Sequence, residues 1–532
     1  MNDLSRAREH LDSGQTDQAI ALLHKVIRSS PKNAEALQQL GRVHLDRLKQ
    51  PSVANEAFRR ATAIAPANAE AAYHLGKSHF ELGDVAEAIA CWRQARDLGR
   101  QSGHADVVEY CLKAIAVAIP GSPRADNAEI LQARSEWVAT WPSPQATADD
   151  FWARDRSPDR PLRIGYVSSF FNRENWMKPV WALMNAHDRE RFLIHVFSFG
   201  PVPGGENPGV GVDTAWRPQD DDRVFDVGKL STKALAKVIA DEQIDLLIDL
   251  NGYSDTDRLS LFAMRPAPLI VGWFNMYATT AMPWYDYLIG DRHVVAPHEE
   301  VDYSERILRV PGSYLTFDVG YAVPEVSPPP CAAAGRLTFG SLCSRYKITP
   351  EVVRAWSEIL ECCPNARLLL RNADLDNQRE QDYLQAQFAL SGVDRSRIEL
   401  VGRAEHFQFL ETYSRIDIAL DTFPYNGGTT TTEAIWQGVP VATFAGETWA
   451  SRTSATILRE GGLGDWVADD LQGCIDLAIR WGRDKDATAR LAELRGTMRD
   501  RLRRSSACDT RAFAQAIESL YREMWRCWCR GE

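Results

Sequence analysis

The 532-residue sequence predicts an array of helical repeats followed by two α/β halves, each built on a parallel sheet. Three observations lead to this prediction. The first hundred or so residues repeat one pattern of small and apolar residues at a fixed interval. From Pro161 onward, short apolar runs alternate with amphipathic helical stretches. A proline-rich segment, 323–334, then separates a first set of such units from a second.

The N-terminal repeats, which we assign to residues 1–120, have a period of about 34 residues. Residues 33–44 recur as residues 68–79, and one extra residue near Pro51 explains the interval of 35. Small residues at helix crossings, followed by an aromatic residue and a proline, are typical of tetratricopeptide repeats. Stacked repeats share one core and usually present a groove to a peptide, although the array could serve only to brace the rest of the chain.

Connecting helices are expected between the repeats and the first α/β half, over 107–119 and 127–141, and we assign 121–158 to this connection. The first half spans 159–325. Its expected strands are 162–168, 193–198 and 244–250, and its expected helices are 179–186 and 231–242. Because strands alternate with helices, the strands should form a doubly wound parallel sheet.

The second half, 335–532, shows the same alternation. Its expected strands are 337–340, 366–370, 398–401, 417–420 and 439–443, with helices at 350–362, 377–390 and 406–414. Two such halves would bind a ligand where the carboxyl ends of the strands meet. The amphipathic stretch 511–530 predicts a final helix that packs back on the halves. The cluster Trp525, Cys527 and Trp528 either extends that contact or mediates self-association, which leaves a homo-oligomer open.

Composition narrows the class of protein. A hydrophobic fraction of 45% and a charged fraction of 25% are ordinary for a globular protein, and a net charge of −11 disfavours nucleic-acid binding through a broad basic face. The N-terminus lacks the order of a secretory signal. The apolar segment 269–286 is too interrupted to span a membrane, so a buried strand plus loop is expected. The ten cysteines show no CxxC spacing, which argues against zinc and favours thiols in a reducing cytoplasm.

The most informative motif is Asp421-Thr-Phe-Pro-Tyr-Asn-Gly-Gly-Thr-Thr-Thr-Thr-Glu433. It follows an expected strand and opens a helix on four hydroxyl residues. Unpaired N–H groups and the positive end of the helix dipole make such a helix start a site for phosphate. Glu433 lies one turn further in, where a carboxylate can bind ribose hydroxyls. Taken alone, the motif is also compatible with an ordinary threonine-capped helix.

Several motifs in the same order resemble those of the protein O-GlcNAc transferase family, which includes the plant SPINDLY proteins and bacterial relatives. They lie at 162–169, 251–253, 261–268, 346–348, 421–436, 438–440 and 446–452. The resemblance implies an α-helical tetratricopeptide superhelix followed by an α/β GT-B glycosyltransferase with two Rossmann-like halves. It also implies transfer of a sugar from a nucleotide donor, UDP-GlcNAc, to serine or threonine of a protein, with no metal ion and no cofactor.

The resemblance assigns roles to single residues. Lys347 matches the lysine that meets the donor diphosphate, where a cation stabilises the charge that grows on the leaving group. The donor-binding candidates are Ala404, His406, Asn426, Gly427, Gly428, Thr429, Thr430, Thr431, Glu433 and Arg452. Ala404 would meet the base, His406 either stands for a basic residue or starts a helix, and Glu433 replaces an aspartate that binds ribose. Arg452 either faces the ligand or closes an internal ion pair.

On the acceptor and sugar side the sequence departs from the family pattern. The candidates there are Asn251, Gly252, Tyr277 and Thr279, although a tight turn would also explain the first two. Phe170 stands at an aspartate position and Glu174 at a histidine position. Glu174 is therefore a candidate base for the acceptor hydroxyl, with an ordinary surface position as the alternative. The loop 275–279 lacks two glycines of the family, which would fill space near the sugar.

The favoured hypothesis is a cytoplasmic protein O-glycosyltransferase whose repeats bind the polypeptide acceptor. One alternative is the same fold acting with a different nucleotide sugar on a bacterial surface protein such as flagellin, because the sugar-facing loop is changed. The other is a tetratricopeptide scaffold without activity, for which Phe170, Glu174 and Phe409 speak. The retention of Lys347 together with the threonines and Glu433 speaks against a scaffold.

Overall fold

The structure is a computed structural model that describes residues 3–141, 151, 154–171, 174–200 and 216–532. The chain forms two compact units, which are described separately. The first contains Met1–Ala125, Arg336–Glu405 and Thr422–Tyr425; the second contains Asp126–Gly335, His406–Asp421 and Asn426–Glu532. The boundaries expected for the repeats, the connection and the two halves remain predictions.

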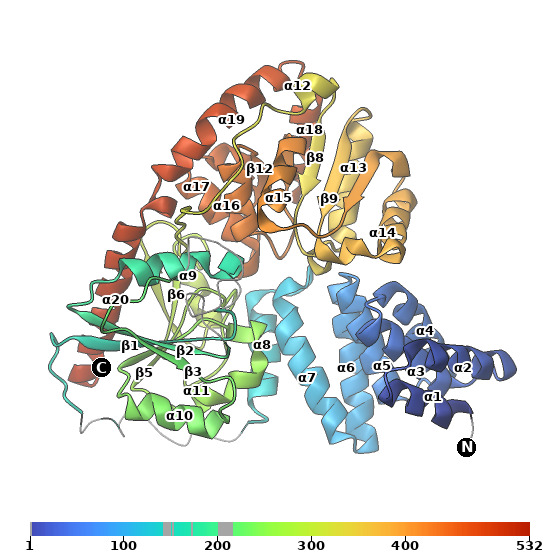
Figure 1. Cartoon of the computed structure of the whole chain (residues 1–532), viewed down its shortest axis with the longest axis horizontal. Coiled ribbons are helices and arrows are strands. Elements are labelled where there is room, and N and C mark those ends of the chain that lie inside the picture. The colour runs from blue at the N-terminus through green and yellow to red at the C-terminus, as the bar shows by residue number, and fades with distance from the viewer. Residues whose placement is uncertain (1–2, 142–150, 152–153, 172–173, 201–215) are drawn as a thin grey trace. The chain divides into compact units, whose positions relative to one another are not determined.

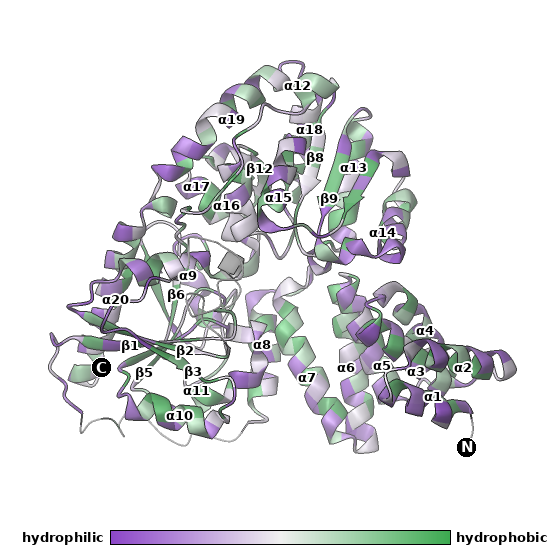
Figure 2. Ribbon diagram, viewed as in Figure 1, coloured by the Kyte–Doolittle hydropathy of each residue, from purple (hydrophilic) through white to green (hydrophobic). Residues whose placement is uncertain are grey.

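The first unit begins with the predicted helical repeats, drawn in blue in Figure 1. The helices are α1 (Asp3–Asp12), α2 (Thr16–Ser29), α3 (Ala34–Arg42), α4 (Pro51–Ile64), α5 (Ala69–Glu81), α6 (Val85–Ser102) and α7 (Ala105–Ala118), and a π-helical segment, η1 (Val43–Arg47), continues α3. The side chains of Asn33 and Asn68 cap α3 and α5, each by accepting a backbone N–H three residues further on. Hydrophobic and hydrophilic residues lie on different sides of these helices (Figure 2).

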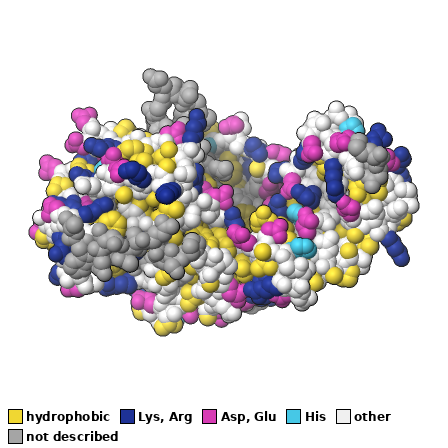
Figure 3. All heavy atoms as spheres, turned by 90° about the horizontal axis from the view of Figure 1, so that it is seen from below, with side chains coloured by type: hydrophobic (Ala, Val, Ile, Leu, Met, Phe, Trp, Pro, Cys, Tyr) yellow, Lys and Arg dark blue, Asp and Glu magenta, His cyan; other side chains and the backbone are white. Residues whose placement is uncertain are grey.

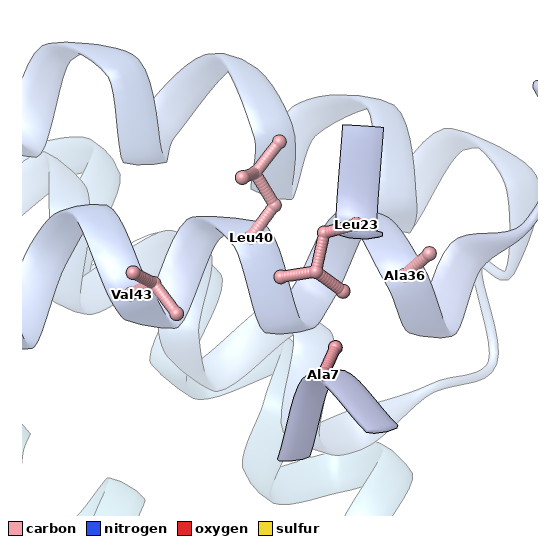
Figure 4. Packing of buried hydrophobic residues seen from close by; sticks show 5 residues of the cluster. All are labelled: Ala7, Leu23, Ala36, Leu40 and Val43. Carbon is pink, nitrogen blue, oxygen red and sulfur yellow. The ribbon is translucent and has the colours of Figure 1, made fainter. Parts of the chain in front are cut away.

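Small residues let the repeat helices approach closely. A Cβ built on Gly41 would lie 2.7 Å from the ring of Phe58, and one on Gly76 would lie 2.6 Å from Trp92. The first helices share the apolar cluster shown in Figure 4, formed by Ala7, Leu23, Ala36, Leu40 and Val43. The repeat signature in the sequence therefore has a direct packing cause: each glycine makes room for an aromatic ring of the next helix.

The rest of the first unit alternates strands and helices. Its elements are β8 (Thr338–Ser341), η7 (Arg345–Lys347), α13 (Pro350–Cys362), β9 (Arg367–Arg371), η8 (Ala373–Asp376), α14 (Gln378–Leu390), η9 (Arg395–Arg397) and β10 (Ile398–Val401). β8 pairs with β9 and β9 with β10, all in parallel. These bounds confirm the strands and helices expected here to within one or two residues.

The second unit contains a seven-stranded parallel sheet in the order β3-β2-β1-β4-β5-β6-β7. The strands are β1 (Leu162–Ser168), β2 (Phe192–Ser198), β3 (Arg223–Asp226), β4 (Leu246–Asp249), β5 (Leu269–Gly272), β6 (Tyr287–Asp291) and β7 (Arg306–Val310). Helices α8 (Asn127–Val138), α9 (Glu174–Ala186), α10 (Thr232–Asp241) and α11 (Ser260–Ala263) accompany them. The strand order reverses between β1 and β4, and ligands of doubly wound sheets bind outside the strand ends at such a point.

The second unit also holds three parallel strands in the order β11-β12-β13. These strands are β11 (Ile418–Leu420), β12 (Val441–Phe444) and β13 (Val467–Ala468); the helices of this region are α15 (His406–Glu411), α16 (Thr429–Trp436), α17 (Thr453–Glu460), α18 (Leu471–Arg483) and α19 (Ala487–Arg503). Parallel sheets that follow helical repeats along the chain confirm the predicted fold class. Strands β3, β6, β7 and β13 were not expected, whereas β5 begins the segment 269–286 for which a strand plus loop was expected.

The final helix, α20 (Thr510–Arg530), contacts α9, β5 and β7 of the second unit. Phe513, Ile517, Tyr521 and Met524 of its apolar stripe are buried. Trp525 donates its indole N–H to the carbonyl of Ser157 at 3.1 Å, and Trp525 and Trp528 are both buried. Internal packing is thus what the structure shows for this cluster.

Charges of both signs are interspersed on the face shown in Figure 3, so the net charge of −11 is not gathered into one patch there. Among the described residues, no helix is both long enough and apolar enough to cross a bilayer.

The close approach of α5 and α6 makes a stability prediction. Replacing Gly76 by alanine forces a methyl group against Trp92, and we expect the free energy of unfolding to fall by about 1–3 kcal/mol because the core is overpacked. Urea denaturation followed by circular dichroism measures this. The matched control is Gly121→Ala, where a Cβ would meet nothing within 4 Å. Equal stability of the two variants would contradict the packing argument.

Candidate functional site

The start of α16 lacks a side-chain cap. Gly428 is the N-cap residue and has no side chain to offer, and the first intrahelical bond runs from Thr432 N–H to the Gly428 carbonyl. The amides of Thr429, Thr430 and Thr431 precede that bond. Within the described part of the chain, the hydroxyls of Thr429 and Thr430 make no hydrogen bond, and both residues are half-buried. Such a helix start offers N–H and O–H donors, together with the helix dipole, to an anion.

The turn before α16 is held rigidly. The Asp421 carboxylate accepts the Gly427 N–H at 3.0 Å and the Thr443 hydroxyl at 2.7 Å. The buried Asn426 side chain donates to the Ser451 carbonyl at 2.9 Å. A Cβ on Gly427 would lie 2.5 Å from the Thr431 hydroxyl, so only glycine fits. The turn residues Asn426 and Gly427 therefore shape the helix start, and their contact with a donor stays a prediction.

Lys347 lies at the end of the short segment η7 in the first unit. Its Nζ sits 4.0 Å from the ring centroid of Tyr425, a cation–π contact. Tyr425 belongs to the same sequence motif as the threonines of α16, four residues before Thr429. The Thr422 hydroxyl donates to the Tyr425 carbonyl at 2.8 Å and helps to fix that tyrosine. The predicted lysine is thus oriented by a residue of the predicted phosphate motif.

Glu433 of α16 is paired with a lysine that the sequence analysis missed. Lys178 of α9 donates to Glu433 Oε1 at 2.8 Å and to the Tyr321 hydroxyl at 2.9 Å, and it also lies over the Tyr321 ring. The side chains of Lys178 and Glu433 are only 2% and 6% exposed. Burial by itself raises the pKa of Glu433, but Lys178 and His406 outweigh it and hold that pKa below its ordinary value. Glu433 is therefore a buried carboxylate that stays charged.

His406 completes this cluster. Its Nε2 lies 3.0 Å from Glu433 Oε1 and 3.1 Å from Lys178 Nζ. A single ring nitrogen either donates to the glutamate or accepts from the lysine, so the tautomer of His406 decides which bond forms. His406 is also the first residue of α15, which is the helix-start role considered for it; contact of His406 with a donor stays a prediction.

Arg452 forms an internal ion pair. Its Nη1 lies 2.6 Å from Glu299 Oε2, and its Nε donates to the Gly446 carbonyl at 2.6 Å. Burial raises the pKa of Glu299, but the arginine more than compensates and the net shift is downward. Of the two roles considered for Arg452, the ion pair is the one seen here; contact with a donor stays a prediction.

Asn251 and Gly252 form a tight turn at the end of β4. The Asn251 side chain accepts the Ser168 hydroxyl at 2.9 Å and the Ser169 N–H at 3.0 Å, so it joins the ends of β1 and β4. Gly252 has φ = 50°, and a Cβ there would lie 2.8 Å from the Asn275 carbonyl. Both residues meet the turn requirement at the topological switch point, while a role in sugar or acceptor binding is untested.

The Asp249 carboxylate fixes the turn of Asn251 and Gly252 by hydrogen bonds. It accepts the N–H groups of Asn251 and Gly252 at 2.9 and 3.1 Å and the Tyr285 hydroxyl at 2.8 Å. Burial raises the pKa of Asp249 to about 6, although these hydrogen bonds lower it. The end of β4 is therefore preorganised by a carboxylate inside the fold.

The loop with Tyr277 and Thr279 is held in an unusual conformation. Phe274, Tyr277 and Ala281 have φ angles of 78°, 56° and 57°, which each cost about 1 kcal/mol or more for a residue with a side chain. The Thr279 hydroxyl donates to the buried Glu305 at 2.8 Å. Strain of this kind persists only where contacts over-determine the backbone, and it concentrates at ligand sites.

Two remaining candidates are less defined. Ala404 lies between β10 and α15, in a stretch where the Arg403 N–H donates to Asp376 at 2.8 Å. Glu174 is the first residue of α9, but its side chain lies outside the described part of the structure. Its proposed role as a base is therefore untested. Sequence reasoning missed Lys178, Tyr321 and Tyr425, which act as partners of predicted residues.

Two parallel Rossmann-like sheets, a helix start suited to a diphosphate and a strand-end turn at the switch point define the GT-B class of glycosyltransferase folds. The family model described as Glycosyl transferase family 41 matches residues 146–327 and 334–517. The chain belongs to this family. A second family model, described as anaphase-promoting complex, cyclosome, subunit 3, matches residues 12–95 in the repeat region.

Known relatives agree with this membership. A probable UDP-N-acetylglucosamine–peptide N-acetylglucosaminyltransferase SPINDLY of Oryza sativa is 31% identical over 414 residues, 76% of this chain and 43% of its own length. The SEC protein of Arabidopsis thaliana, described with the same activity, is 30% identical and covers 70% of this chain and 38% of its own. The chain thus spans less than half the length of these relatives. A mutant of the Thermobaculum terrenum O-GlcNAc transferase is similar in structure, with a TM-score of 0.77, 30% identity and coverage of 99% of this chain and 98% of that one.

The Lys178–Glu433 pair makes a second stability prediction. Lys178→Met leaves a buried carboxylate without its cation, and we expect the free energy of unfolding to fall by about 3–5 kcal/mol. The double variant Lys178→Met/Glu433→Gln should recover much of that loss, because no unpaired charge remains. Urea denaturation of all variants measures both effects. As a control, Lys237→Met removes an exposed pair with Asp241 and should cost less than about 1 kcal/mol.

Proposed function

We propose that this chain is a protein O-glycosyltransferase that moves GlcNAc from UDP-GlcNAc to serine or threonine of a polypeptide. The observation that carries the proposal is the family 41 match through both α/β halves, together with Lys347 beside the motif that opens α16. The plant relatives are described as UDP-N-acetylglucosamine–peptide N-acetylglucosaminyltransferases and the Thermobaculum terrenum structure as an O-GlcNAc transferase, which supports this donor and a peptide acceptor. The donor would be a substrate, with no resident cofactor and no metal ion.

The proposed reaction is a displacement at the anomeric carbon of the donor sugar. The acceptor oxygen forms a bond to that carbon, the bond from the carbon to the diphosphate oxygen breaks, and the hydroxyl proton passes to a base. UDP leaves with the electron pair and gains negative charge. Lys347 and the donors at the start of α16 would stabilise that charge, which is where electrostatic catalysis acts most strongly. Glu174 is the candidate base, in keeping with a carboxylate whose pKa can be tuned by its surroundings.

Glu433 would bind the ribose in this proposal. Its described interactions with Lys178 and His406 all use Oε1. A carboxylate has a second oxygen, so a ribose hydroxyl could donate to Oε2 while Oε1 stays paired. The ion pair thus need not compete with the nucleotide and would instead fix the carboxylate in place for it.

The acceptor polypeptide would bind to the repeats, because stacked helical repeats form extended concave surfaces. We also place the protein in the cytoplasm, since its cysteines show no spacing typical of a secreted disulfide framework. A flagellin or another bacterial surface protein is one candidate acceptor.

Replacing Lys347 tests the assignment of the leaving-group cation. We expect Lys347→Ala to lower the turnover of UDP-GlcNAc by about 10²–10³-fold, the usual loss when one donor to a developing charge is removed. The measurement is UDP release from UDP-GlcNAc with and without host-cell protein as acceptor. Lys237→Ala, at an exposed lysine of α10, is the control and should behave as the wild type. Full activity of Lys347→Ala would refute the proposed role, and retained cellular function without turnover would indicate a scaffold.

Donor identity calls for a binding test. Isothermal titration against UDP-GlcNAc, other UDP-sugars and CMP-sugars should show the tightest binding for UDP-GlcNAc. The reason is that the diphosphate and ribose groups of the site are retained, although the loop 275–279 differs from the family pattern. A tighter CMP-sugar, or a tighter UDP-sugar without the N-acetyl group, would overturn the proposed donor and favour the altered-sugar alternative.

A further inference from the structure

The repeat formed by α5 and α6 touches the chain segment that carries Lys347, and both lie in the first unit. Gly83, in the turn between α5 and α6, has φ = 80° and packs directly on residues beside the lysine. A Cβ at Gly83 would lie 2.6 Å from the Ile348 carbonyl oxygen and 3.0 Å from Arg345 Nη1. No room is left for a side chain at this contact, so the turn of the repeat and the lysine segment form a close fit.

Aromatic rings connect the same repeat to the lysine. Phe80 of α5 stacks on Tyr346, with ring centroids 5.9 Å apart and an angle of 17° between the planes. Tyr346 in turn stacks on Tyr425 at 6.1 Å and 30°. Lys347 Nζ lies 4.0 Å over the Tyr425 ring. A continuous set of ring contacts therefore leads from the repeat to the tyrosine that orients the lysine.

The lysine segment is also fixed from inside. Arg345 is buried, and its Nη1 donates to the Ile348 carbonyl at 2.9 Å, which closes the short segment around Lys347. Burial lowers the pKa of Arg345. The carbonyl that Arg345 holds is the one against which Gly83 packs. A shift of the repeat would consequently displace both Arg345 and Ile348, which lie on either side of Lys347.

A second contact keeps the repeats in register with this region. Glu380 of α14 accepts the Ser52 hydroxyl at 2.7 Å and the Ser52 N–H at 3.3 Å. Ser52 lies in the first turn of α4, whose own N-cap residue Gln50 makes no side-chain cap bond. Glu380 therefore caps a repeat helix from 328 residues away, and burial raises its pKa although the Ser52 bonds lower it.

We infer that the tetratricopeptide array positions Lys347, so that Gly83 and Phe80 of the array, together with Tyr346 of the lysine segment, are positioning residues for transfer. The inference rests on the proposed function of Lys347 at the leaving diphosphate. A cation that stabilises developing charge must be held within a fraction of an ångström, and misplacement by about 1 Å can cost on the order of 10²-fold in rate. The repeats supply that precision through the Gly83 contact and the ring stack.

A pair of glycine variants separates positioning from stability. Gly83→Ala and Gly103→Ala both place a side chain at a left-handed position after a repeat helix, with φ of 80° and 76°. Only the first drives a methyl group into Ile348, since a Cβ at Gly103 meets nothing within 4 Å. We expect both variants to lose stability by urea denaturation, Gly83→Ala by more because its methyl group overpacks the contact, so kcat is compared under conditions where both are folded. Gly83→Ala should lower kcat for UDP release from UDP-GlcNAc by about 10-fold or more, with a smaller change in KM, while Gly103→Ala keeps the wild-type kcat.

Two further variants keep the inference testable if Gly83→Ala does not fold. Phe80→Leu keeps much of the apolar volume but removes the ring, and it should lower kcat, whereas Phe80→Tyr retains the stack and should restore it. In a Lys347→Ala background, Phe80→Leu should have no further effect on kcat, because the group it positions is gone. If Lys347→Ala loses turnover while Gly83→Ala matches Gly103→Ala and Phe80→Leu matches Phe80→Tyr, the inference fails and the proposed function stands. If Lys347→Ala retains turnover, the proposed role of the lysine fails first.

Discussion

The charge of Glu433 is the constraint on which the contact between α9 and α16 depends. Its side chain is 6% exposed, and a carboxylate at that depth must be paired or take up a proton. Lys178 supplies the counter-charge from α9, an element 255 residues earlier in the chain. The pair therefore joins α9 to α16 and at the same time keeps the carboxylate ionised. A glutamate that was neutral would offer a ribose hydroxyl a weaker acceptor, so the structural pair and the proposed binding role require the same charge state.

Lys178 and Lys347 each lie over a tyrosine ring, with Nζ 4.0 Å from the ring centroid. An ion pair neutralises a lysine, whereas the face of an aromatic ring orients an ammonium group by its quadrupole without cancelling the charge. Lys178 with Glu433 and Tyr321 is a paired, buried lysine, and it serves the fold. Lys347 is half-buried over Tyr425, and the α5–α6 repeat supports that arrangement through Tyr346.

Much of this organisation could be predicted from the sequence because it depends on local patterns. The repeat period follows from glycines that face Phe58 and Trp92, and the start of α16 follows from glycines and threonines that punctuate a strand and a helix. Strands β3 and β7 were missed because Arg223–Asp226 and Arg306–Val310 mix charged and apolar residues at the edges of the sheet. Lys178 was missed for a different reason. A lysine in an apolar helix has no local sign of its partner, and Glu433 becomes its neighbour only through the fold.

The loop 275–279 differs from the family pattern in its residues but still has a strained backbone. The two missing glycines fall at Asn275 and Ala278, but the left-handed positions of the loop are Phe274, Tyr277 and Ala281. The substitutions therefore add side-chain volume, and the conformational demand is met by other residues. Hydrogen bonds to residues before the loop hold its backbone in place. Asn275 donates to the Ser254 hydroxyl at 2.8 Å, and the Tyr253 hydroxyl donates to the Thr280 carbonyl at 2.7 Å. A loop that keeps a strained backbone after losing its glycines is held by its surroundings, and strain held in this way is what a preorganised ligand site requires.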